Sequence, residues 1–231
     1  MSVSLPFLNA EHYICGDTPL LFRRVTDVPH LYVDWGDVQH CLNNPWMYNI
    51  EILDSNNTKV QMPTVPHPWH GNWHPDKKVI MDLVNDNHTF VIAKYGHHNK
   101  AVNELLQSIE NAFDVACDAH IYGALGGASS FKIHWDQPAN FIMQIHGETH
   151  WTVYNERCST LVKYTGFPYN PTEDEVTPAI DTVLQPGDML YIPSRCYHCA
   201  RPDQERLSLS IPCWHDPENK PDRNQYILDI T

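Results

Sequence analysis

A series of short strand patterns fills the second half of the chain and limits the possible folds more than any other feature. From residue 120 onward, segments of strand length combine β-branched, aromatic and alternating apolar residues. The clearest of them cover 140–146, 149–155, 160–165, 189–193 and 206–212. Turn signals that contain glycine or proline separate several of these segments. Many short strands with few helices predict a mainly β fold, either a barrel or a sandwich.

Two helices are predicted before these strands. Asp34 can accept a hydrogen bond from the free N–H groups of a following first turn, so we expect it to cap a short helix over residues 35–42. Apolar residues at helical spacing predict a second helix over residues 100–116, with Asn99 as its cap. The apolar face of this second helix is expected to pack against the outside of the sheet.

Three other segments in the first hundred residues carry weaker signals. Residues 79–84 form a short apolar run that fits a helix or a strand, and residues 90–93 fit a strand. Residues 62–76 are rich in Pro, His and Trp, which predicts a surface loop outside any regular element. Such a loop can face a substrate or pack as an aromatic cluster.

The length of the chain suits one domain. A chain of 231 residues can bury a full core, so we expect a single domain over residues 1–231. Within it, we expect mixed elements and a packing helix over 1–116, a barrel with the site over 117–214, and a tail over 215–231.

Composition and charge limit the location and the partners. No stretch approaches about eighteen consecutive apolar residues, so we expect no membrane span. The first residues lack the cationic start and apolar run of a secretory signal. We therefore expect a cytoplasmic protein whose seven cysteines stay reduced. A formal net charge of −13 argues against nucleic acid binding. It suits a cationic substrate or partner, although a solvated acidic surface is the commoner explanation. The sequence leaves the oligomeric state open.

Three candidate metal ligands lie within the strand series. His134 and Asp136 are two positions apart, so on a strand both side chains point to the same face. His198 follows a further strand pattern and can approach the same point from another strand of a barrel. Two imidazoles and one carboxylate can occupy one face of an iron(II) ion and leave three positions for substrates and oxygen. We therefore predict a non-haem iron oxygenase with these three residues as its metal-binding and catalytic groups, and expect Trp135 to point away into packing.

A pair of cysteines around His198 raises a different possibility. Cys196 and Cys199 form a Cys-x-x-Cys pair, which occurs in zinc sites and in redox sites. A structural zinc site needs four ligands, usually from two such pairs, and the sequence holds no second pair. The iron interpretation is therefore favoured over zinc or redox chemistry.

Two blocks of sequence together resemble the JmjC branch of the cupin oxygenases. Residues 134–147 carry His-x-Asp, then Asn140, an apolar run and Gln-x-x-Gly, similar to asparaginyl-hydroxylase-like and ribosomal-oxygenase-like members. Residues 184–193, followed by His198, are similar to the second block of the same family. The resemblance covers about residues 117–214.

The resemblance implies both a fold and an activity. The fold is a double-stranded β-helix, the cupin or jelly-roll barrel, with peripheral helices. The cofactors and cosubstrates are iron(II), 2-oxoglutarate and O2. The implied reaction is hydroxylation of a peptide side chain or of a small amino-acid-like substrate, with succinate and CO2 as co-products.

The position that usually anchors 2-oxoglutarate differs in this chain. Members of the family usually carry Lys or Arg fifteen residues after the first metal histidine, and this chain has Thr149 there. A dicarboxylate buried without a cationic partner would be costly. Strand alternation places Lys132 on the face of His134, so we expect Lys132, or failing that Arg206, to anchor the cosubstrate. The alternative is that Lys132 turns out to solvent.

Further residues are predicted around the cosubstrate and the substrate. The resemblance implies that Asn140 and Tyr122 contact the keto acid, unless Tyr122 is only a packed side chain. Ser208, on the last strand, shares one face with Ser210 and is expected to line the site. Candidates for the wall of the substrate pocket are His146, His150 and Trp151.

Two other functions stay open at this point. A cupin dioxygenase, isomerase or lyase that does not use 2-oxoglutarate is the first, because Thr149 breaks the usual anchor. A non-catalytic binding module is the second, and the presence of all three ligand residues argues against it.

Overall fold

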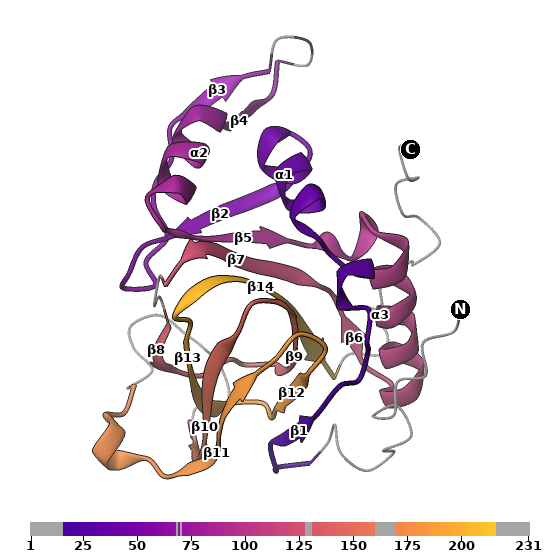
Figure 1. Cartoon of the computed structure of the whole chain (residues 1–231), viewed down its shortest axis with the longest axis vertical. Coiled ribbons are helices and arrows are strands. Elements are labelled where there is room, and N and C mark those ends of the chain that lie inside the picture. The colour runs from indigo at the N-terminus through magenta and orange to yellow at the C-terminus, as the bar shows by residue number, and fades with distance from the viewer. Residues whose placement is uncertain (1–15, 68, 70, 128–130, 160–169, 216–231) are drawn as a thin grey trace.

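The computed structural model describes residues 16–67, 69, 71–127, 131–159 and 170–215, and its fold is mainly β, as the sequence predicts (Figure 1). The strands of the larger sheet are β1 Leu20–Phe22, β2 Asn49–Leu53, β5 Thr89–Ala93, β6 Ala116–Cys117, β7 His120–Gly126, β9 Ala139–His146, β12 Met189–Ile192 and β14 Gln204–Trp214. The strands of the smaller sheet are β8 Phe131–His134, β10 Thr149–Arg157, β11 Pro178–Leu184 and β13 Cys196–Arg201. A separate hairpin consists of β3 Thr64–Pro66 and β4 Trp73–Pro75.

The two main sheets face each other as the walls of a barrel. The larger sheet has eight strands in the order β1-β12-β9-β14-β7-β5-β2, with β6 beside β14. The smaller sheet has four strands in the order β11-β10-β13-β8. Strands far apart in the sequence are therefore neighbours, and neighbouring strands in both sheets pair in antiparallel fashion.

Four of the five predicted strand segments are confirmed, as β9, β10, β12 and β14. The fifth, residues 160–165, lies outside the described residues. The strand predicted over 90–93 is confirmed as β5.

The helices are α1 Trp35–Asn43, α2 Lys77–Asn85 and α3 Lys100–Phe113, with short 3-10 turns at η2 Pro29–Leu31, η3 Tyr95–His97 and η4 Glu173–Glu175. Asp34 caps α1 as predicted, because its carboxylate accepts the Asp37 N–H at 2.9 Å. Asn99 caps α3 through the Val102 N–H at 3.1 Å. This helix ends three residues before the predicted end, because Asp114 adopts a left-handed conformation with φ 52°. Within the described ranges, every helix is too short or too polar to cross a lipid bilayer.

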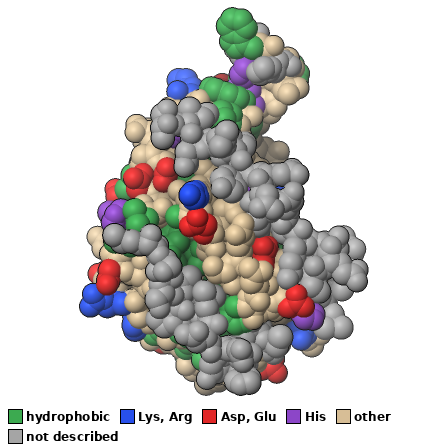
Figure 2. Space-filling model, turned by 90° about the vertical axis from the view of Figure 1, so that its right-hand side faces the viewer, with side chains coloured by type: hydrophobic (Ala, Val, Ile, Leu, Met, Phe, Trp, Pro, Cys, Tyr) green, Lys and Arg blue, Asp and Glu red, His purple; other side chains and the backbone are tan. Residues whose placement is uncertain are grey.

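The prediction of an irregular loop over residues 62–76 is wrong, because β3 and β4 pair there as a hairpin. Proline is tolerated at the edges of such a two-stranded ribbon, where not every backbone N–H is needed for pairing. Trp46 packs beside His67 and His74 of this hairpin, with ring centroids 5.2 and 5.8 Å away. Figure 2 shows the hairpin standing out at the top of the molecule, with hydrophobic side chains at its tip.

Apolar side chains form cores on both sides of the larger sheet. Val102, Leu106 and Ile109 of α3 belong to the core on its outer face, which confirms where this helix packs. A second core fills the space between the sheets and includes Ile142 and Trp151. The barrel thus has a packed interior, and the site lies in the part of it that carries polar side chains.

Candidate metal centre

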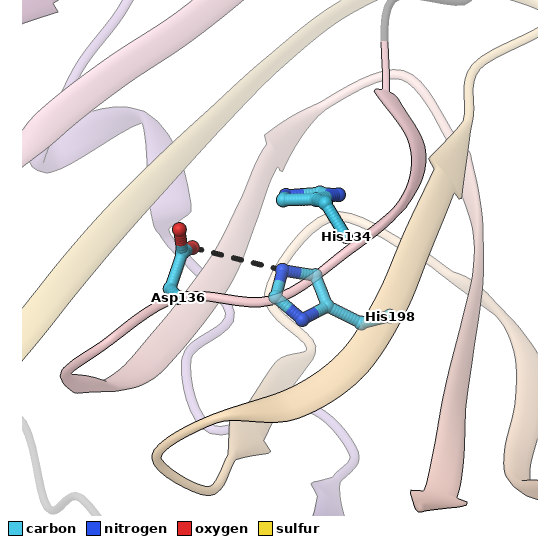
Figure 3. Close-up of side chains that lie close together, drawn as sticks. All are labelled: His134, Asp136 and His198. Carbon is cyan, nitrogen blue, oxygen red and sulfur yellow. Dashed lines mark ion pairs between the residues drawn. The ribbon is translucent and has the colours of Figure 1, made fainter. Parts of the chain in front are cut away.

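Pairing between β8 and β13 brings the predicted metal ligands together. His134 ends β8 and lies directly opposite His198 on β13, and their ring centroids are 4.3 Å apart. Asp136 follows β8, and its carboxylate lies 3.7 Å from Nε2 of His198 (Figure 3). One donor atom from each residue lies within 4.8 Å of the other two. Among the described residues, this is the one group of three or more His, Cys, Asp or Glu side chains close enough to share a metal ion.

Backbone carbonyl groups orient both imidazoles. Nδ1 of His134 lies 2.8 Å from the Lys132 carbonyl oxygen, and Nδ1 of His198 lies 2.9 Å from that of Cys196. A carbonyl oxygen only accepts hydrogen bonds, so Nδ1 of each ring donates its proton. The neutral ring then has its lone pair on Nε2, which is the atom needed to bind a metal.

The turn between β12 and β13 supports the backbone around Asp136. The Arg195 N–H donates to the Asp136 carbonyl oxygen at 2.8 Å, and the Ser194 hydroxyl donates to that of Gln137 at 2.6 Å. These bonds fasten the segment after β8 to the turn that leads to His198. The three ligand residues therefore belong to one hydrogen-bonded unit, although they come from two distant parts of the sequence.

A cavity between the two sheets contains the three ligand residues. Its other polar lining residues are Tyr122, Asn140, Arg206, Ser208 and Ser210. Its apolar lining residues are Ile142, Trp151 and Ala200.

The side chains that line this cavity differ in their exposure to solvent. The Asp136 side chain is 37% exposed and that of His198 is 3% exposed, whereas Arg206 is 1% exposed. Asp136 thus lies at the exposed end of the cavity, whereas His198 and Arg206 lie in its buried part.

Hydrogen bonds between β9 and β14 position the neutral polar groups. The Ser208 hydroxyl donates to the Gln144 amide oxygen at 2.9 Å, and the Gln144 amide nitrogen donates to backbone carbonyls at the end of β9. Asn140 and Ser210 are joined at 2.9 Å. The predictions that Asn140 and Ser208 line the cavity agree with this arrangement, and their contacts with a keto acid stay predictions.

Arg206 is a buried cation in the lining of the cavity. Its Nε and Nη2 atoms are buried and have no hydrogen-bond partner among the described residues. Burial lowers the pKa of Arg206 to about 10, and the charge interaction with Tyr122 opposes this shift. The guanidinium therefore keeps its charge at neutral pH.

Tyr122 lies opposite Ser208 on the neighbouring strand β7 and lines the same cavity. Burial, followed by the charges of Asp136 and Glu51, raises the pKa of its phenol. The phenol therefore stays protonated at neutral pH and is able to donate a hydrogen bond.

The expectation that Lys132 points into the barrel is wrong. Its side chain is exposed and lines a separate surface cavity with Ile133 and Arg201. The cause is a bulge in the pairing of β8 with β13, since Phe131 and His134 lie opposite Ala200 and His198. One extra residue of β8 interrupts the alternation from which the prediction was made. Lys132 therefore contributes only its backbone carbonyl to the site.

Three other predicted positions also lie outside the cavity. Thr149 is buried but is absent from the cavity lining. His150 is adjacent to Trp151 on β10 and so points to the opposite face, where it pairs with Asp181 at 2.6 Å. His146 follows a register shift at the end of β9 and points outward to Glu205, 3.1 Å away.

Trp151 and Trp135 lie where the sequence placed them. Trp151 lines the cavity and stacks on His198 with a centroid distance of 6.1 Å. Trp135 is 1% exposed and packs in a core outside the smaller sheet.

Two residues that line the cavity were not predicted from the sequence, Ile142 and Ala200, although each lies two positions after a predicted site residue on the same strand. Strand alternation alone would have found both.

The cysteines around His198 do not form a second site. Cys196 and Cys199 point to opposite faces of β13 and belong to different apolar cores. Both are free thiols, and burial raises the pKa of Cys196 to about 11. Among the described residues, the zinc and redox alternatives therefore have no supporting geometry.

Comparison with known families identifies the barrel. A sequence profile of the JmjC domain matches residues 94–220, more than half of the chain. The chain belongs to the JmjC-domain family. Members of this family of cupin oxygenases use iron(II) and 2-oxoglutarate.

Individual relatives agree with this assignment. Ribosomal oxygenase 1 of Danio rerio is 32% identical over 117 residues, which are 49% of this chain and 21% of the relative. The protein of Dictyostelium discoideum named bifunctional lysine-specific demethylase and histidyl-hydroxylase NO66 is 31% identical over 114 residues, 49% of this chain and 22% of that protein. This chain thus aligns with about a fifth of the length of the curated relatives it matches.

A solved structure supports the fold. The Escherichia coli ribosomal oxygenase YcfD, in complex with cobalt and 2-oxoglutarate, superposes with a TM-score of 0.57. The alignment covers 95% of this chain and 53% of YcfD at 17% sequence identity. Such a low identity establishes the shared fold and nothing finer.

The residues present fit the cofactors of the JmjC family. Two imidazole nitrogens and one carboxylate oxygen are the donor set that suits iron(II) with open positions. A buried cation in the same cavity, without a partner among the residues that the structure describes, suits an anionic cosubstrate. His134, Asp136 and His198 would hold the metal ion, which supplies oxygen activation when it is bound.

Proposed function

We propose that this protein is an iron(II)- and 2-oxoglutarate-dependent hydroxylase that acts on a peptide side chain or a small amino-acid-like substrate. The observation that carries the proposal is the convergence of His134, Asp136 and His198 in a cavity that is also lined by a buried cation, Arg206. In the overall reaction, a substrate C–H bond, O2 and 2-oxoglutarate yield a C–OH group, succinate and CO2.

The residues of the cavity have separate tasks in this proposal. The backbone carbonyls of Lys132 and Cys196 keep both imidazoles in the tautomer that binds a metal. Ile142, Trp151 and Ala200 provide an apolar wall that excludes water from the reacting groups. Enclosure by fixed side chains also holds the reactants in register.

The depth profile of the cavity supports a polypeptide as the substrate. Because Asp136 lies at the exposed end and Arg206 at the buried end, the cosubstrate can fill the base while the target bond approaches from solvent. A large substrate then needs to insert only one side chain. The names of the relatives, a lysine demethylase and a histidyl hydroxylase, describe proteins that modify side chains. The formal net charge of −13 further favours a basic peptide over an acidic one.

Succinate formation tests the proposal. Purified protein is incubated with iron(II), 2-oxoglutarate and either basic peptides, acidic peptides or free amino acids, and succinate and a 16-dalton mass gain are measured. We expect both products only when iron(II) and 2-oxoglutarate are present together, and we expect Asp136→Ala to abolish both. Turnover of a substrate that is indifferent to 2-oxoglutarate would instead support the cupin metalloenzyme without a keto acid. Absence of metal binding would remove both enzymes and leave a binding module.

A further inference from the structure

A buried guanidinium without an anionic partner is the least satisfied group in the cavity. Arg206 is 1% exposed, and both Nε and Nη2 are buried without a hydrogen-bond partner among the described residues. No ion pair of the described residues includes Arg206, and the one side chain that shifts its pKa electrostatically is Tyr122, whose phenol is neutral at neutral pH. Native proteins rarely bury a cation in this way unless a ligand completes its surroundings.

The two unpartnered atoms define the shape of the missing anion. Nε and Nη2 carry the two parallel N–H groups along one edge of the guanidinium plane. A carboxylate presents two oxygens at matching spacing and accepts both bonds at once. Apart from the three metal ligands, the other polar groups that line the cavity are neutral hydroxyl and amide groups, which do not balance the charge of Arg206.

The metal ligands and Arg206 can each bind a different end of a dicarboxylate. Asp136 of the ligand triad lies at the exposed end of the cavity, and Arg206 lies in its buried part. A 2-oxo acid chelates a metal through its keto oxygen and the adjacent carboxylate. Its distal carboxylate is then the group available to Arg206 in the buried part of the cavity.

We propose that Arg206 on β14 binds the distal carboxylate of 2-oxoglutarate, in place of the base that relatives carry at the position of Thr149 on β10. The inference rests on the proposed function. Thr149 has no charge, and its side chain is buried outside the cavity lining. Lys132, the rival cation, points away to the surface. In this proposal the anchoring cation lies on the larger sheet, whereas the relatives carry theirs at a position that belongs to the smaller sheet here.

Binding measurements without turnover test the proposal. Protein loaded with manganese(II) is titrated calorimetrically with 2-oxoglutarate and with 2-oxobutyrate, which lacks the distal carboxylate. Loss of a buried charged partner weakens binding by about 100-fold or more, so Arg206→Gln should lose this much affinity for 2-oxoglutarate. Its affinity for 2-oxobutyrate and for manganese(II) should change less than about three-fold, because neither contacts Arg206.

Two variants serve as controls. Arg201→Gln removes a guanidinium from the outer face of β13, where Arg201 pairs with Glu173, and should leave both affinities unchanged. Lys132→Ala should do the same. Unchanged 2-oxoglutarate affinity in Arg206→Gln, or an equal loss for both keto acids, would overturn the proposal, and a selective loss in Lys132→Ala would restore the rival anchor.

The wild-type protein provides an independent test in case Arg206→Gln fails to fold. The keto acid 5-methyl-2-oxohexanoate carries an isopropyl group in place of the distal carboxylate, so it has nearly the same shape as 2-oxoglutarate but no distal charge. We expect it to bind about 30-fold more weakly or worse, and equal binding overturns the anchor. If wild-type protein binds manganese(II) but neither keto acid, the proposed function fails as well, so the two failures can be told apart.

Discussion

Gly147 closes the turn between β9 and β10, and its replacement by alanine is expected to strain the backbone next to Arg206. Gly147 has φ +64°, and a Cβ atom there would lie 2.0 Å from the Glu205 carbonyl oxygen and 3.3 Å from the Arg206 Cα. The left-handed conformation costs a non-glycine residue roughly 1–2 kcal/mol. The contact with Glu205 is with backbone, so β14 has to shift, and overpacking of this kind typically costs about 1–3 kcal/mol.

Together these costs predict that Gly147→Ala lowers the free energy of unfolding by about 2–5 kcal/mol. Gly71 offers a matched control, because it has φ +66° but nothing lies within 4 Å of its would-be Cβ. Gly71→Ala should therefore cost at most the conformational part, about 1–2 kcal/mol. The difference between the two variants isolates the collision with the Glu205 carbonyl.

Urea unfolding followed by circular dichroism measures both variants, with the midpoint and the slope fitted separately. The same titrations with 2-oxoglutarate should show weaker binding by Gly147→Ala and not by Gly71→Ala, because the shift moves Arg206. If Gly147→Ala is no less stable than Gly71→Ala, the close approach of β14 to this turn is refuted.

Three further outcomes are expected. Asp136→Ala should weaken manganese(II) binding by calorimetry about 100-fold or more while the circular dichroism spectrum stays unchanged, because its side chain is 37% exposed and carries little packing. Trp135→Ala should lower the free energy of unfolding by roughly 3–5 kcal/mol in thermal or urea melts, since Trp135 is 1% exposed, and a loss below 1 kcal/mol would contradict its place in the core. Burial lowers the pKa values of His98 and His120 in the folded state, so the unfolded chain takes up protons first as the pH falls. Stability should therefore decrease between about pH 7 and pH 5, and His98→Gln or His120→Gln should flatten that dependence in thermal melts; a steeper dependence would contradict the assignment.

Local chemistry was sufficient to place His134 and Asp136 on one face and to predict the helix starts. His134 and Asp136 share a face because they are two positions apart at the end of a strand, and no distant contact is needed to know it. Asp34 and Asn99 cap their helices through bonds to residues three positions away. Such features depend on neighbours in the chain, so the sequence carries the whole signal.

The cosubstrate end of the cavity depends on how distant strands pair. Lys132 and Arg206 were both candidate anchors, and strand alternation favoured Lys132. The bulge that turns Lys132 outward exists only in the pairing of β8 with β13, and the burial of Arg206 arises only where β14 pairs with β7 and β9. His146 moved out of the cavity for a similar reason, a register shift against β14.

The sequence by itself determined which side chains can bind a metal and that a strand-rich barrel would carry them. Only the tertiary structure decided which cation is buried beside them. A register shift of one residue reverses the face that a strand presents, and the register is set by packing and hydrogen bonds between segments far apart in the chain. The residues of one strand alone therefore do not show which strand it pairs with, or in which register.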